Sequence, residues 1–501
     1  MRLNDLWPND NWDEDTLNAM DDALSRIEIT GVTCDSRRVE PGFVFAALPG
    51  SKTDGRRFID EAVKRGAAAV IVPMDESDLP ALEIPVVRDL DPRRRYALLA
   101  AAFHGAQPGH IAAVTGTNGK TSVAWFARQL LNAAGLPAAS AGTLGIMGTA
   151  PDGHALCDIR GSLTTPDPAD LHRDLKTLKA AGIDHLVLEA SSHGLDQRRL
   201  DGVRVRAAAF TNLSRDHLDY HRTEDAYLTA KLRLFDTLTV EGGQAVVNMD
   251  ARFAEAFASA AQRRGLEVIG VGTAETCLFR ILDVRPTQTG LDLAFQIEGV
   301  RHNMQLPLIG AFQASNALVA LALVSALGVE PSHTVAGLAH LQAAPGRMQF
   351  CGAHDSGAGV YVDYAHTPDA LETVLKAVRP HATGRVHVVF GCGGDRDPGK
   401  RPEMGQAASD CADVVIVTDD NPRSEDAAEI RRQAMAGATG ATEIGNRHEA
   451  IRTAVSNLQK GDVLVVAGKG HEQGQIVGDQ VLPFDDVKEV RSVLGILEGG
   501  V

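Results

Sequence analysis

The segment Ala113–Ser122 reads A-V-T-G-T-N-G-K-T-S, and it limits the possible folds of this chain more than any other segment. An apolar strand leads into a glycine-containing turn, and Lys-Thr then opens a helix, which is the arrangement of a phosphate-binding loop. Gly116 and Gly119 allow backbone N–H groups to face a phosphate, and the helix N-terminus adds positive potential. Lys120 supplies a cation for the outer phosphates, and Thr121 supplies a hydroxyl for Mg²⁺. The sequence therefore predicts a nucleotide site in an α/β domain.

Length and charge indicate a large enzyme and exclude several other classes of protein. The chain has 501 residues, too many for one hydrophobic core, and this length predicts about three domains. The net charge of −16 argues against a nucleic-acid surface. The six cysteines have no C-x-x-C spacing, which favours reduced thiols. The acidic N-terminus has no signal-peptide pattern. No apolar run approaches the roughly 20 residues of a membrane span. We therefore expect a cytoplasmic, monomeric protein without nucleic-acid or membrane partners.

Alternating strand and helix patterns divide the chain into three expected domains, residues 1–109, 110–342 and 343–501. This alternation predicts parallel sheets covered by helices. The expected strands are 44–48, 67–72, 110–114, 183–188, 205–210, 244–248, 360–363, 386–390, 414–418 and 463–467, and the expected helices are 57–65, 121–134 and 314–327.

In the third domain, all four expected strands run directly into polar loops that contain glycine or proline. These loops are 364–368, 391–401, 419–423 and 468–472. A single polar loop would carry no information, because loops are generally polar. Four loops rich in Arg, Asp, His and Glu at the carboxyl edge of one parallel sheet predict a ligand site there.

In the central domain, a carboxylate follows the expected strand 183–188. Glu189 stands beside the phosphate loop, where a Mg²⁺ ligand is needed; the alternative is a cap of the following helix. The next strand leads into residues 211–221, which include His217 and His221. The H-E-x-x-H pattern of a zinc site is absent from this run. Structural polar packing remains the alternative interpretation for most of its residues.

Seven motifs, in order along essentially the whole chain, resemble the Mur ligase family, whose members join an ATP-activated carboxylate to an amine. The phosphate loop has Val114 where the standard G-x(4)-G-K-[ST] pattern has glycine, and T-G-T-N-G-K-T is the form seen in this family. The other motifs are E-A-S-S-H-G-L (189–195), N-L-S-R-D-H-L-D-Y-H (212–221), A-K-L-R-L-F (230–235), P-G-R-M (345–348), Y-A-H-T-P (364–368) and G-K-G-H-E (468–472). Within the family, the chain is most similar to the members that add the third peptide residue to a UDP-N-acetylmuramoyl dipeptide.

The resemblance implies an α/β fold with three domains: an N-terminal domain for the UDP substrate, a central P-loop ATPase domain with a parallel sheet, and a Rossmann-like C-terminal domain for an amino acid. It also implies ATP and Mg²⁺. The positions that match the ATP site are Gly116, Thr117, Asn118, Gly119, Lys120, Thr121, Ser122, Asn316, Arg347 and Asp363. Those that match the Mg²⁺ ligands are Thr121, Glu189, His217 and Lys231, and the implied catalytic residues are Lys120, His217 and Lys231.

Lys231 matches a lysine that family members carry as a carbamate. Addition of CO₂ to a neutral amine converts a cation into a carboxylate, which can bind Mg²⁺. Taken alone, Lys231 is one of several lysines on a helical stretch, which is typical of a solvated face.

The resemblance places the nucleotide sugar on residues of the first two domains. Ser36, in D-S-R at 35–37, matches the uridine contact, and the positions matching the muramoyl-dipeptide site are Thr164, Thr165, Ser191, Gln197 and Arg199. Without the resemblance, T-T-P at 164–166 is interpreted as a turn as readily as a binding segment. Likewise, Q-R-R at 197–199 is interpreted as a solvated basic patch as readily as a binding segment. Two departures occur: Gln313 replaces an Asn in the usual F-N-x-x-N, and Gln349 replaces the common Glu after G-R-M.

The loop 420–423 reads D-N-P-R, which resembles the form that accepts meso-diaminopimelate. This amino acid differs from lysine by one carboxylate, and an arginine fork pairs with a carboxylate in bidentate fashion. A plain Asn-Pro turn is the alternative. The positions matching the amino-acid pocket are Arg396, Asp420, Asn421, Pro422, Arg423, Gly468 and Glu472.

The implied reaction forms an acyl phosphate from the γ-carboxylate of D-glutamate and ATP, and the amine then displaces phosphate. Three alternatives remain. Another amide ligase of the family is one, although a folate ligase should lack D-S-R and D-N-P-R. A lysine-adding relative is the second, and a P-loop switch with ATP turnover independent of an amino acid is the third.

Overall fold

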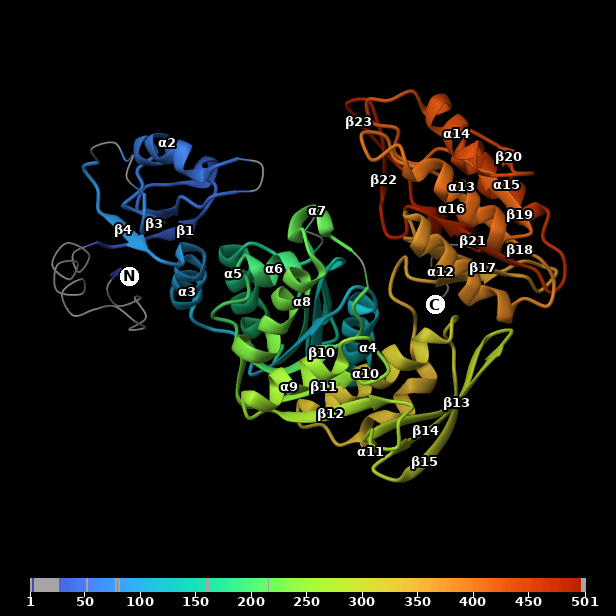
Figure 1. Cartoon of the computed structure of the whole chain (residues 1–501), viewed down its shortest axis with the longest axis horizontal. Helices are drawn as coiled ribbons and strands as arrows, with labels where there is room; N and C mark the ends of the chain where they lie inside the picture. Colours follow the sequence, from blue (N-terminus) through green and yellow to red (C-terminus); the bar gives the residue numbers. More distant parts are fainter. Residues whose placement is uncertain are drawn as a thin grey trace. The chain divides into compact units, whose positions relative to one another are not determined.

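The computed structural model describes residues 2–3, 27–50, 53–76, 79, 82–158, 163–214 and 216–496 (Figure 1). The N-terminal acidic segment considered above falls almost entirely outside these residues, as does Arg215 of the second central motif. The chain forms two compact units, which we describe separately. The first unit comprises Met1–Lys120, Leu131–Ile269 and Leu323–Val329, and the second comprises Thr121–Leu130, Gly270–Ala322 and Glu330–Val501.

The N-terminal part of the first unit is a parallel four-stranded sheet. Its strands lie in the order β1 (Gly31–Thr33), β2 (Phe43–Ala46), β3 (Ala69–Pro73) and β4 (Val86–Asp89). Its helices are η2 (Ser36–Arg38), η3 (Gly55–Phe58), α2 (Ile59–Lys64) and α3 (Pro92–His104). Asp91 caps α3 and Pro92 occupies its first turn, an arrangement that favours helix initiation. The expected strands 44–48 and 67–72 are confirmed with shifted ends, and helix 57–65 is confirmed as α2 preceded by a 3-10 turn.

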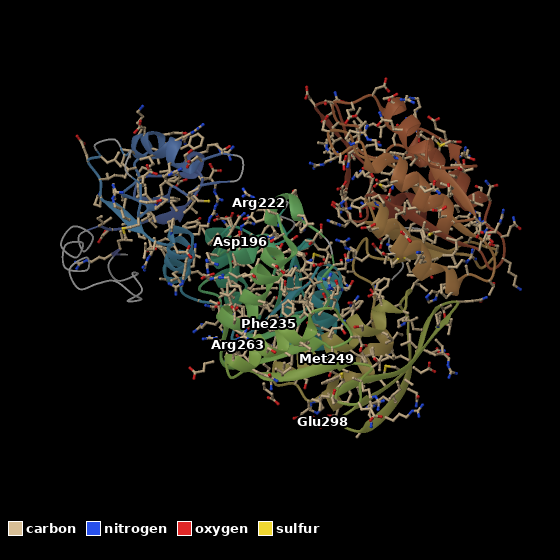
Figure 2. All side chains as sticks on the ribbon, in the orientation of Figure 1. Asp196, Arg222, Phe235, Met249, Arg263 and Glu298 are labelled. Carbon is tan, nitrogen blue, oxygen red and sulfur yellow. The ribbon has the colours of Figure 1, made fainter. Side chains whose placement is uncertain are left out.

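The central sheet of the first unit is parallel through β11, β10, β5, β9 and β6, as predicted. The strands are β5 (His110–Thr115), β6 (Ala138–Gly142), β9 (His185–Glu189), β10 (Val205–Phe210) and β11 (Thr239–Asn248). All expected central strands are therefore confirmed. The helices are α5 (Pro168–Ala180), α6 (Ser192–Asp196), α7 (Leu218–His221), α8 (Glu224–Arg233), the π-helical turn η4 (Leu234–Leu238) and α9 (Ala254–Arg263). Phe235, labelled in Figure 2, is fully buried in this core and its ring contacts that of Phe257.

The predicted parallel arrangement does not extend to one margin of the central sheet. Strands β7 (Gly145–Thr149) and β8 (Ala155–Asp158) continue from β6 as antiparallel neighbours. Only Thr143 and Leu144 connect β6 to β7, and so short a connection joins antiparallel strands but cannot join parallel ones.

A second antiparallel group lies in the second unit, after β12 (Glu267–Gly272), whose last residues pair with β13. It contains β13 (Phe279–Thr287), β14 (Gly290–Ile297) and β15 (Val300–Leu306). Glu298, labelled in Figure 2, and Gly299 both have positive φ, at 49° and 87°, which fits the tight hairpin turn between β14 and β15.

The helices that follow the phosphate loop and β15 match their predictions closely. They are α4 (Lys120–Ala133) and α10 (Phe312–Ala326). A short α11 (Pro331–Thr334) and a 3-10 helix η5 (Val335–His340) come next.

The C-terminal part of the second unit is a six-stranded sheet in the order β16-β17-β21-β18-β19-β20. The strands are β16 (Gln349–Ala353), β17 (Gly359–Asp363), β18 (Val386–Phe390), β19 (Val414–Val417), β20 (Thr442–Glu443) and β21 (Val463–Ala467). All pairs are parallel except β16 with β17. The four predicted strands are confirmed, and so is the convergence of their following loops at one edge.

Helices cover both faces of this sheet. They are α12 (Pro368–Val378), η6 (Arg379–His381), α13 (Lys400–Cys411), α14 (Ala427–Met435), α15 (Arg447–Ser456) and α16 (Asp486–Val493), and a hairpin of β22 (Gly474–Val477) and β23 (Gln480–Pro483) precedes the last one (Figure 1). Val463 and Val465 of β21 pack in the core with α12, α13 and α14, whereas Leu464 and Val466 pack with α15 and α16. Alternating side chains of one strand thus fill both faces.

No helix in the described part of the chain is both long and apolar enough to cross a membrane.

Candidate functional site

The phosphate loop begins where β5 ends and is packed against the residues that follow β10. A side-chain Cβ at Gly116 would lie 1.9 Å from Thr211 Oγ1, so only glycine fits this approach. Thr211 Oγ1 donates to Asn118 O at 2.6 Å, and Asn118 N donates to Asn212 Oδ1 at 3.0 Å. Thr117 N donates to Asn212 O at 2.8 Å. The motif N-L-S-R-D-H therefore supports the loop through its first residue.

Lys120 lies over this loop. Its Nζ donates to Gly116 O at 2.9 Å and to Thr117 O at 2.8 Å, which places the ammonium group at the loop itself. Thr121 and Ser122 are buried in the first turn of α4. A cation, a helix N-terminus and a loop with room only for glycine together suit a phosphate group.

Glu189, at the end of β9, is buried and contacts the turn between β6 and β7. Its Oε1 accepts from Thr143 N at 2.8 Å, and its Oε2 accepts from Thr143 Oγ1 at 3.2 Å. The alternative role as a helix cap is wrong, because Ser191 caps α6 by accepting from Gly194 N at 3.0 Å. The Glu189 carboxylate therefore holds the β6–β7 turn, a contact that the sequence did not indicate.

Lys231 of α8 does not lie on a solvated face. Its side chain is about 1% exposed, its Nζ donates to Gly116 O at 2.7 Å, and it lies 4.6 Å from the centre of the Tyr227 ring. Burial, and to a lesser extent the positive charge of Lys120, lowers the pKa of the Lys231 ammonium well below its ordinary value. The structure thus brings Lys231 to the phosphate loop, and its amine is easily deprotonated.

His217 lies at the entry to α7 in a left-handed conformation, with φ 52°, and about half of its side chain is exposed. Its ring is 4.8 Å from that of His193 in α6, and His193 in turn contacts Tyr220 and His221. Burial, followed by the charges of the neighbouring histidines, lowers the pKa of His193 to about 4. Among the described residues, no group of three or more His, Cys, Asp and Glu side chains could hold a metal. Mg²⁺ at a nucleotide site needs few protein ligands, because phosphates and water supply the others.

Four of the residues expected to bind the muramoyl dipeptide form one hydrogen-bonded group. Ser191 Oγ donates to Thr165 Oγ1 at 3.0 Å, and Arg199 Nη1 donates to Thr165 O at 2.7 Å. Arg199 Nη2 donates to Gln197 Oε1 at 2.6 Å. Burial lowers the pKa of Arg199, so the alternative of a solvated basic patch does not hold for this side chain. Among the described residues, Thr164 has no such contact with the group; its Oγ1 lies 3.2 Å from that of Thr143, which is bonded to Glu189.

The structure does not join Ser36 to this group. Ser36 is buried in η2, and its Oγ donates to Glu61 Oε2 at 3.1 Å.

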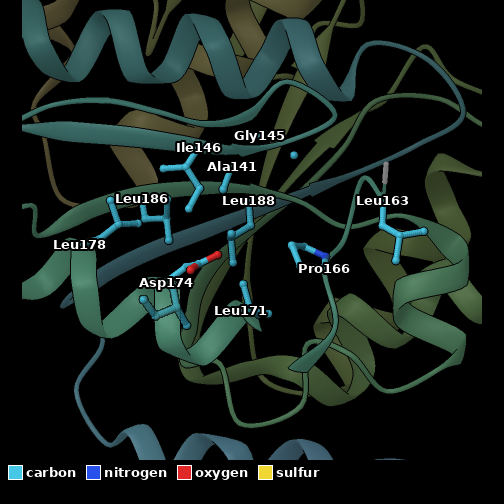
Figure 3. Close-up of a pocket in the computed structure, with 12 residues that line it drawn as sticks. Ala141, Gly145, Ile146, Leu163, Pro166, Leu171, Asp174, Leu178, Leu186 and Leu188 are labelled. Atoms are coloured by element: carbon cyan, nitrogen blue, oxygen red, sulfur yellow. The ribbon is translucent and has the colours of Figure 1, made fainter. Parts of the chain in front are cut away.

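A small apolar cavity of about 30 Å³ lies beside Pro166 (Figure 3). Half of its twelve lining residues are leucines, and Asp174 is the one acidic side chain among them.

In the second unit, the two departures from the family pattern each form a local hydrogen bond. Asn316 Nδ2 donates to Gln313 Oε1 at 3.0 Å, so Gln313 holds a side chain expected at the ATP site. Gln349 Oε1 accepts from Gly346 N at 2.8 Å and fixes the P-G-R-M turn. Asp363, at the end of β17, is buried, and burial raises the pKa of its carboxyl. It accepts from Met348 N and Ala365 N, both at 2.8 Å.

The loops after β18, β19 and β21 contact one another. Arg423 has φ 54°, and its Nη1 donates to Gly394 O at 2.8 Å. A Cβ at Gly468 would lie 2.6 Å from Asp420 Oδ2, so the D-N-P-R and G-K-G-H-E loops pack too closely for a larger residue there. Asn421 Nδ2 donates to Glu472 Oε2 at 2.9 Å. Arg396 lies in the loop after β18, and Pro422 lies between Asn421 and Arg423.

Several residues that support these loops carried no separate signal in the sequence. Lys469 is fully buried and donates to Asn421 Oδ1 at 3.0 Å. Arg447 and Asp486 form a buried ion pair at 2.6 Å. Lys469 lies in the G-K-G-H-E motif, and this was the only sequence feature that indicated a role for it. Arg447 and Asp486 lie outside every motif.

Comparison with known proteins identifies three family profiles in the chain. Residues 28–104 match the profile described as Mur ligase family, catalytic domain, residues 114–324 match the Mur ligase middle domain, and residues 346–470 match the Mur ligase, glutamate ligase domain.

Two curated relatives match over nearly their full length, and both are named UDP-N-acetylmuramoyl-L-alanyl-D-glutamate–2,6-diaminopimelate ligase. The protein of Caulobacter vibrioides is 54% identical over 466 residues, covering 93% of this chain and 95% of that protein. The protein of Brucella melitensis is 53% identical over 470 residues, covering 93% and 94%. A solved structure with the same enzyme name superimposes with a TM-score of 0.71 at 35% identity and covers 99% of both chains.

Proposed function

This chain belongs to the Mur ligase family, and we propose that it joins meso-diaminopimelate to the D-glutamate of UDP-N-acetylmuramoyl-L-alanyl-D-glutamate at the expense of ATP. The product is a cell-wall peptidoglycan precursor. ATP and the UDP-linked dipeptide are cytoplasmic compounds, so we place the reaction in the cytoplasm. We also expect the enzyme to be a monomer. Domain boundaries near residues 109 and 342 are also part of the proposal, and the gaps between the three matched profiles support them.

The observation that carries the choice of amino acid is the D-N-P-R loop at the ligand edge of the C-terminal sheet. Arg423 is held there by a backbone ladder with β22, since Arg423 N donates to Ile476 O at 3.0 Å and Gly478 N donates to Arg423 O at 2.7 Å. We infer that its guanidinium pairs with the second carboxylate of diaminopimelate. L-Lysine lacks this carboxylate and would leave a desolvated donor without its partner, at a cost of about 1–3 kcal/mol.

The phosphate loop is proposed to hold ATP. Gly116, Thr117, Asn118, Gly119, Lys120, Thr121 and Ser122 would surround the phosphates, while Asn316, Arg347 and Asp363 would contact the adenosine and phosphate groups. Thr121, Glu189, His217 and the carbamate of Lys231 would hold Mg²⁺, which neutralises phosphate charge when bound.

The reaction that follows from these groups has two steps. The γ-carboxylate of the D-glutamyl residue attacks the γ-phosphorus of ATP, the bond to ADP breaks, and an acyl phosphate forms. The neutral amine of diaminopimelate then attacks the acyl carbon, and phosphate leaves the tetrahedral intermediate as the amide forms. Lys120 would stabilise charge on the transferred phosphoryl group, so positioning and electrostatics supply most of the rate enhancement.

We also propose that Lys231 carries a carbamate. The reaction is R–NH₂ + CO₂ → R–NH–COO⁻ + H⁺, and it needs the neutral amine. Burial lowers the pKa of Lys231 and so favours the neutral amine, and the contact of Nζ with Gly116 O means that a carboxylate formed on it would lie near the phosphate loop.

The proposed reaction is tested by phosphate release from ATP with the UDP-dipeptide and either meso-diaminopimelate or L-lysine. Wild type should release phosphate only with diaminopimelate, and Arg423→Ala should raise the KM for diaminopimelate about tenfold or more. Arg432→Ala, which removes a largely exposed arginine of the same unit, is the matched control and should behave as wild type. Equal use of lysine by wild type contradicts the role of Arg423. Release without any amino acid favours a switch, and no release with either amine points to another ligase of the family.

The carbamate is tested independently of activity by ¹³C NMR in ¹³C-bicarbonate buffer. Wild type should show a carbamate signal that is absent from Lys231→Met and retained in Lys376→Met, which alters an exposed lysine. A signal that survives in Lys231→Met would place the carbamate elsewhere.

A further inference from the structure

Lys469 is a buried cation in the G-K-G-H-E loop, directly after β21. Its side chain is fully buried, and its Nζ lies 3.0 Å from Asn421 Oδ1 and 3.5 Å from Glu472 Oε2. An ammonium group without water is costly unless hydrogen bonds and an opposite charge compensate it. Both partners of Lys469 are residues expected to contact the amino-acid substrate, and this makes its location informative.

Lys469 is one of three groups that set which way the Asn421 amide faces. Asn421 Oδ1 accepts from Lys469 Nζ and also from Ile476 N at 2.9 Å, while Asn421 Nδ2 donates to Glu472 Oε2 at 2.9 Å. The flipped amide would set its NH₂ group against two donors and its oxygen against a carboxylate. The Lys469 ammonium group, the Ile476 N–H and the Glu472 carboxylate therefore exclude that orientation together.

Lys469 also holds the Glu472 carboxylate, about one third of which is exposed. The two donors, Lys469 Nζ and Asn421 Nδ2, both contact Oε2, so displacement of the carboxylate would break both contacts. The backbone closes the same turn, because Glu472 N donates to Lys469 O at 3.0 Å. One buried cation thus fixes both an amide donor and a carboxylate acceptor.

We propose that Lys469 is a positioning residue for the zwitterionic amino-acid substrate. By fixing Asn421 and Glu472 it presents an N–H donor for a substrate carboxylate and an anionic acceptor for a substrate ammonium group. Lys469 itself does not touch the substrate. This inference rests on the proposed function, because it concerns affinity for the amine that the ligase adds.

The test compares the steady-state kinetics of wild type, Lys469→Met and Lys469→Gln. For Lys469→Met we expect the KM for diaminopimelate to rise about tenfold or more, because a free-energy loss of about 1.4 kcal/mol corresponds to tenfold. The KM values for ATP and the UDP-dipeptide, and kcat at saturating diaminopimelate, should change less than about threefold. Lys469→Gln keeps a donor without the charge and should fall between wild type and Lys469→Met. Lys376→Met is the matched control on an exposed face, with unchanged constants.

A second experiment asks whether Lys469 acts through Asn421. If it does, Lys469→Met should raise the KM for diaminopimelate less in the Asn421→Ala background than in wild type, because only the contact with Glu472 is then left to lose. Independent, additive effects would overturn the inference, as would an unchanged KM in Lys469→Met or equal losses toward all three substrates with a lowered Tm. If Lys469→Met does not fold, a wild-type KM in Lys469→Gln overturns the inference instead. Absence of diaminopimelate-dependent turnover in wild type would refute the proposed function and not the role of Lys469.

Discussion

The ion pair between Arg447 and Asp486 joins the helices α15 and α16 to the loops of the amino-acid site. Both side chains are fully buried, with Nε to Oδ1 at 2.7 Å and Nη2 to Oδ2 at 2.6 Å. Arg447 Nη2 also donates to Ala467 O at 2.9 Å, and Nη1 donates to Asp419 O at 3.4 Å. These two carbonyls stand at the start of the G-K-G-H-E and D-N-P-R loops, so one guanidinium supports both.

Arg447→Met should destabilise the second unit by about 3–5 kcal/mol, because it leaves the Asp486 carboxylate buried without a counter-charge. The double variant Arg447→Met with Asp486→Leu removes that charge as well. It then lacks only the donors to the carbonyls of Ala467 and Asp419, a loss of about 1–3 kcal/mol. The double variant should therefore be more stable than the single variant by about 2 kcal/mol.

Hydrogen exchange of the β21 amides measures the free energy of opening of this unit without requiring the whole chain to unfold in one step. Arg452→Met is the control on the same helix, since Arg452 is largely exposed and paired only with Glu449, and it should change that free energy by less than about 0.5 kcal/mol. A loss below about 1 kcal/mol in Arg447→Met would refute the reasoning. A double variant less stable than the single one would refute it as well.

Three further predictions concern the first unit. Gly116→Ala should abolish ADP binding in calorimetry, because its Cβ would lie 1.9 Å from Thr211 Oγ1; binding within threefold of wild type would contradict the close approach. Burial lowers the pKa of His172 to about 4 from the ordinary 6.5, so the unfolded chain binds this proton first as the pH falls. Protonation of this group should lower the free energy of unfolding by about 3 kcal/mol between pH 6.5 and pH 4. In urea unfolding, His172→Asn should lose less stability than wild type over this pH range, by that amount. Equal losses in the two proteins would argue against a neutral buried imidazole. Tyr96→Phe removes a 2.6 Å hydrogen bond to Asp167 and should lower the unfolding free energy by about 1.5–3 kcal/mol, with a change below about 0.5 kcal/mol as the contrary result.

Four strands of the C-terminal sheet, β17, β18, β19 and β21, were predictable from sequence because they are short, apolar on both faces and followed by polar loops, whereas β16 and β20 were not predicted. Val386–Phe390 and Val463–Ala467 were predicted with their observed bounds. The antiparallel strands were missed for a physical reason. β7 contains two glycines in five residues, and β15 mixes four polar residues with three apolar ones, so neither presents an apolar run.

The candidate site was predictable as a set of loops but not as a set of contacts. Motif order and the rule for parallel sheets indicated which loops share an edge. No spacing in the sequence relates Glu189 to Thr143 or Lys469 to Asn421, because such pairs depend on the folded path of the chain. The burial of Lys231 was missed for a different reason. The helix α8 has no strong apolar stripe, and its polar composition resembles that of a solvated helix.

The backbone ladder between the D-N-P-R loop and β22 bears on how amino-acid preference can be redesigned. Arg423 is held in a left-handed conformation by two hydrogen bonds to the hairpin, and Gln475 Nε2 donates to Asp420 O at 2.6 Å. The orientation of any side chain placed at position 423 therefore depends on the hairpin residues Ile476 and Gly478. Exchange of specificity between family members should succeed when 419–424 and 474–483 are transplanted as one cassette, and a swap of the loop alone should yield a catalyst with little preference for either amine.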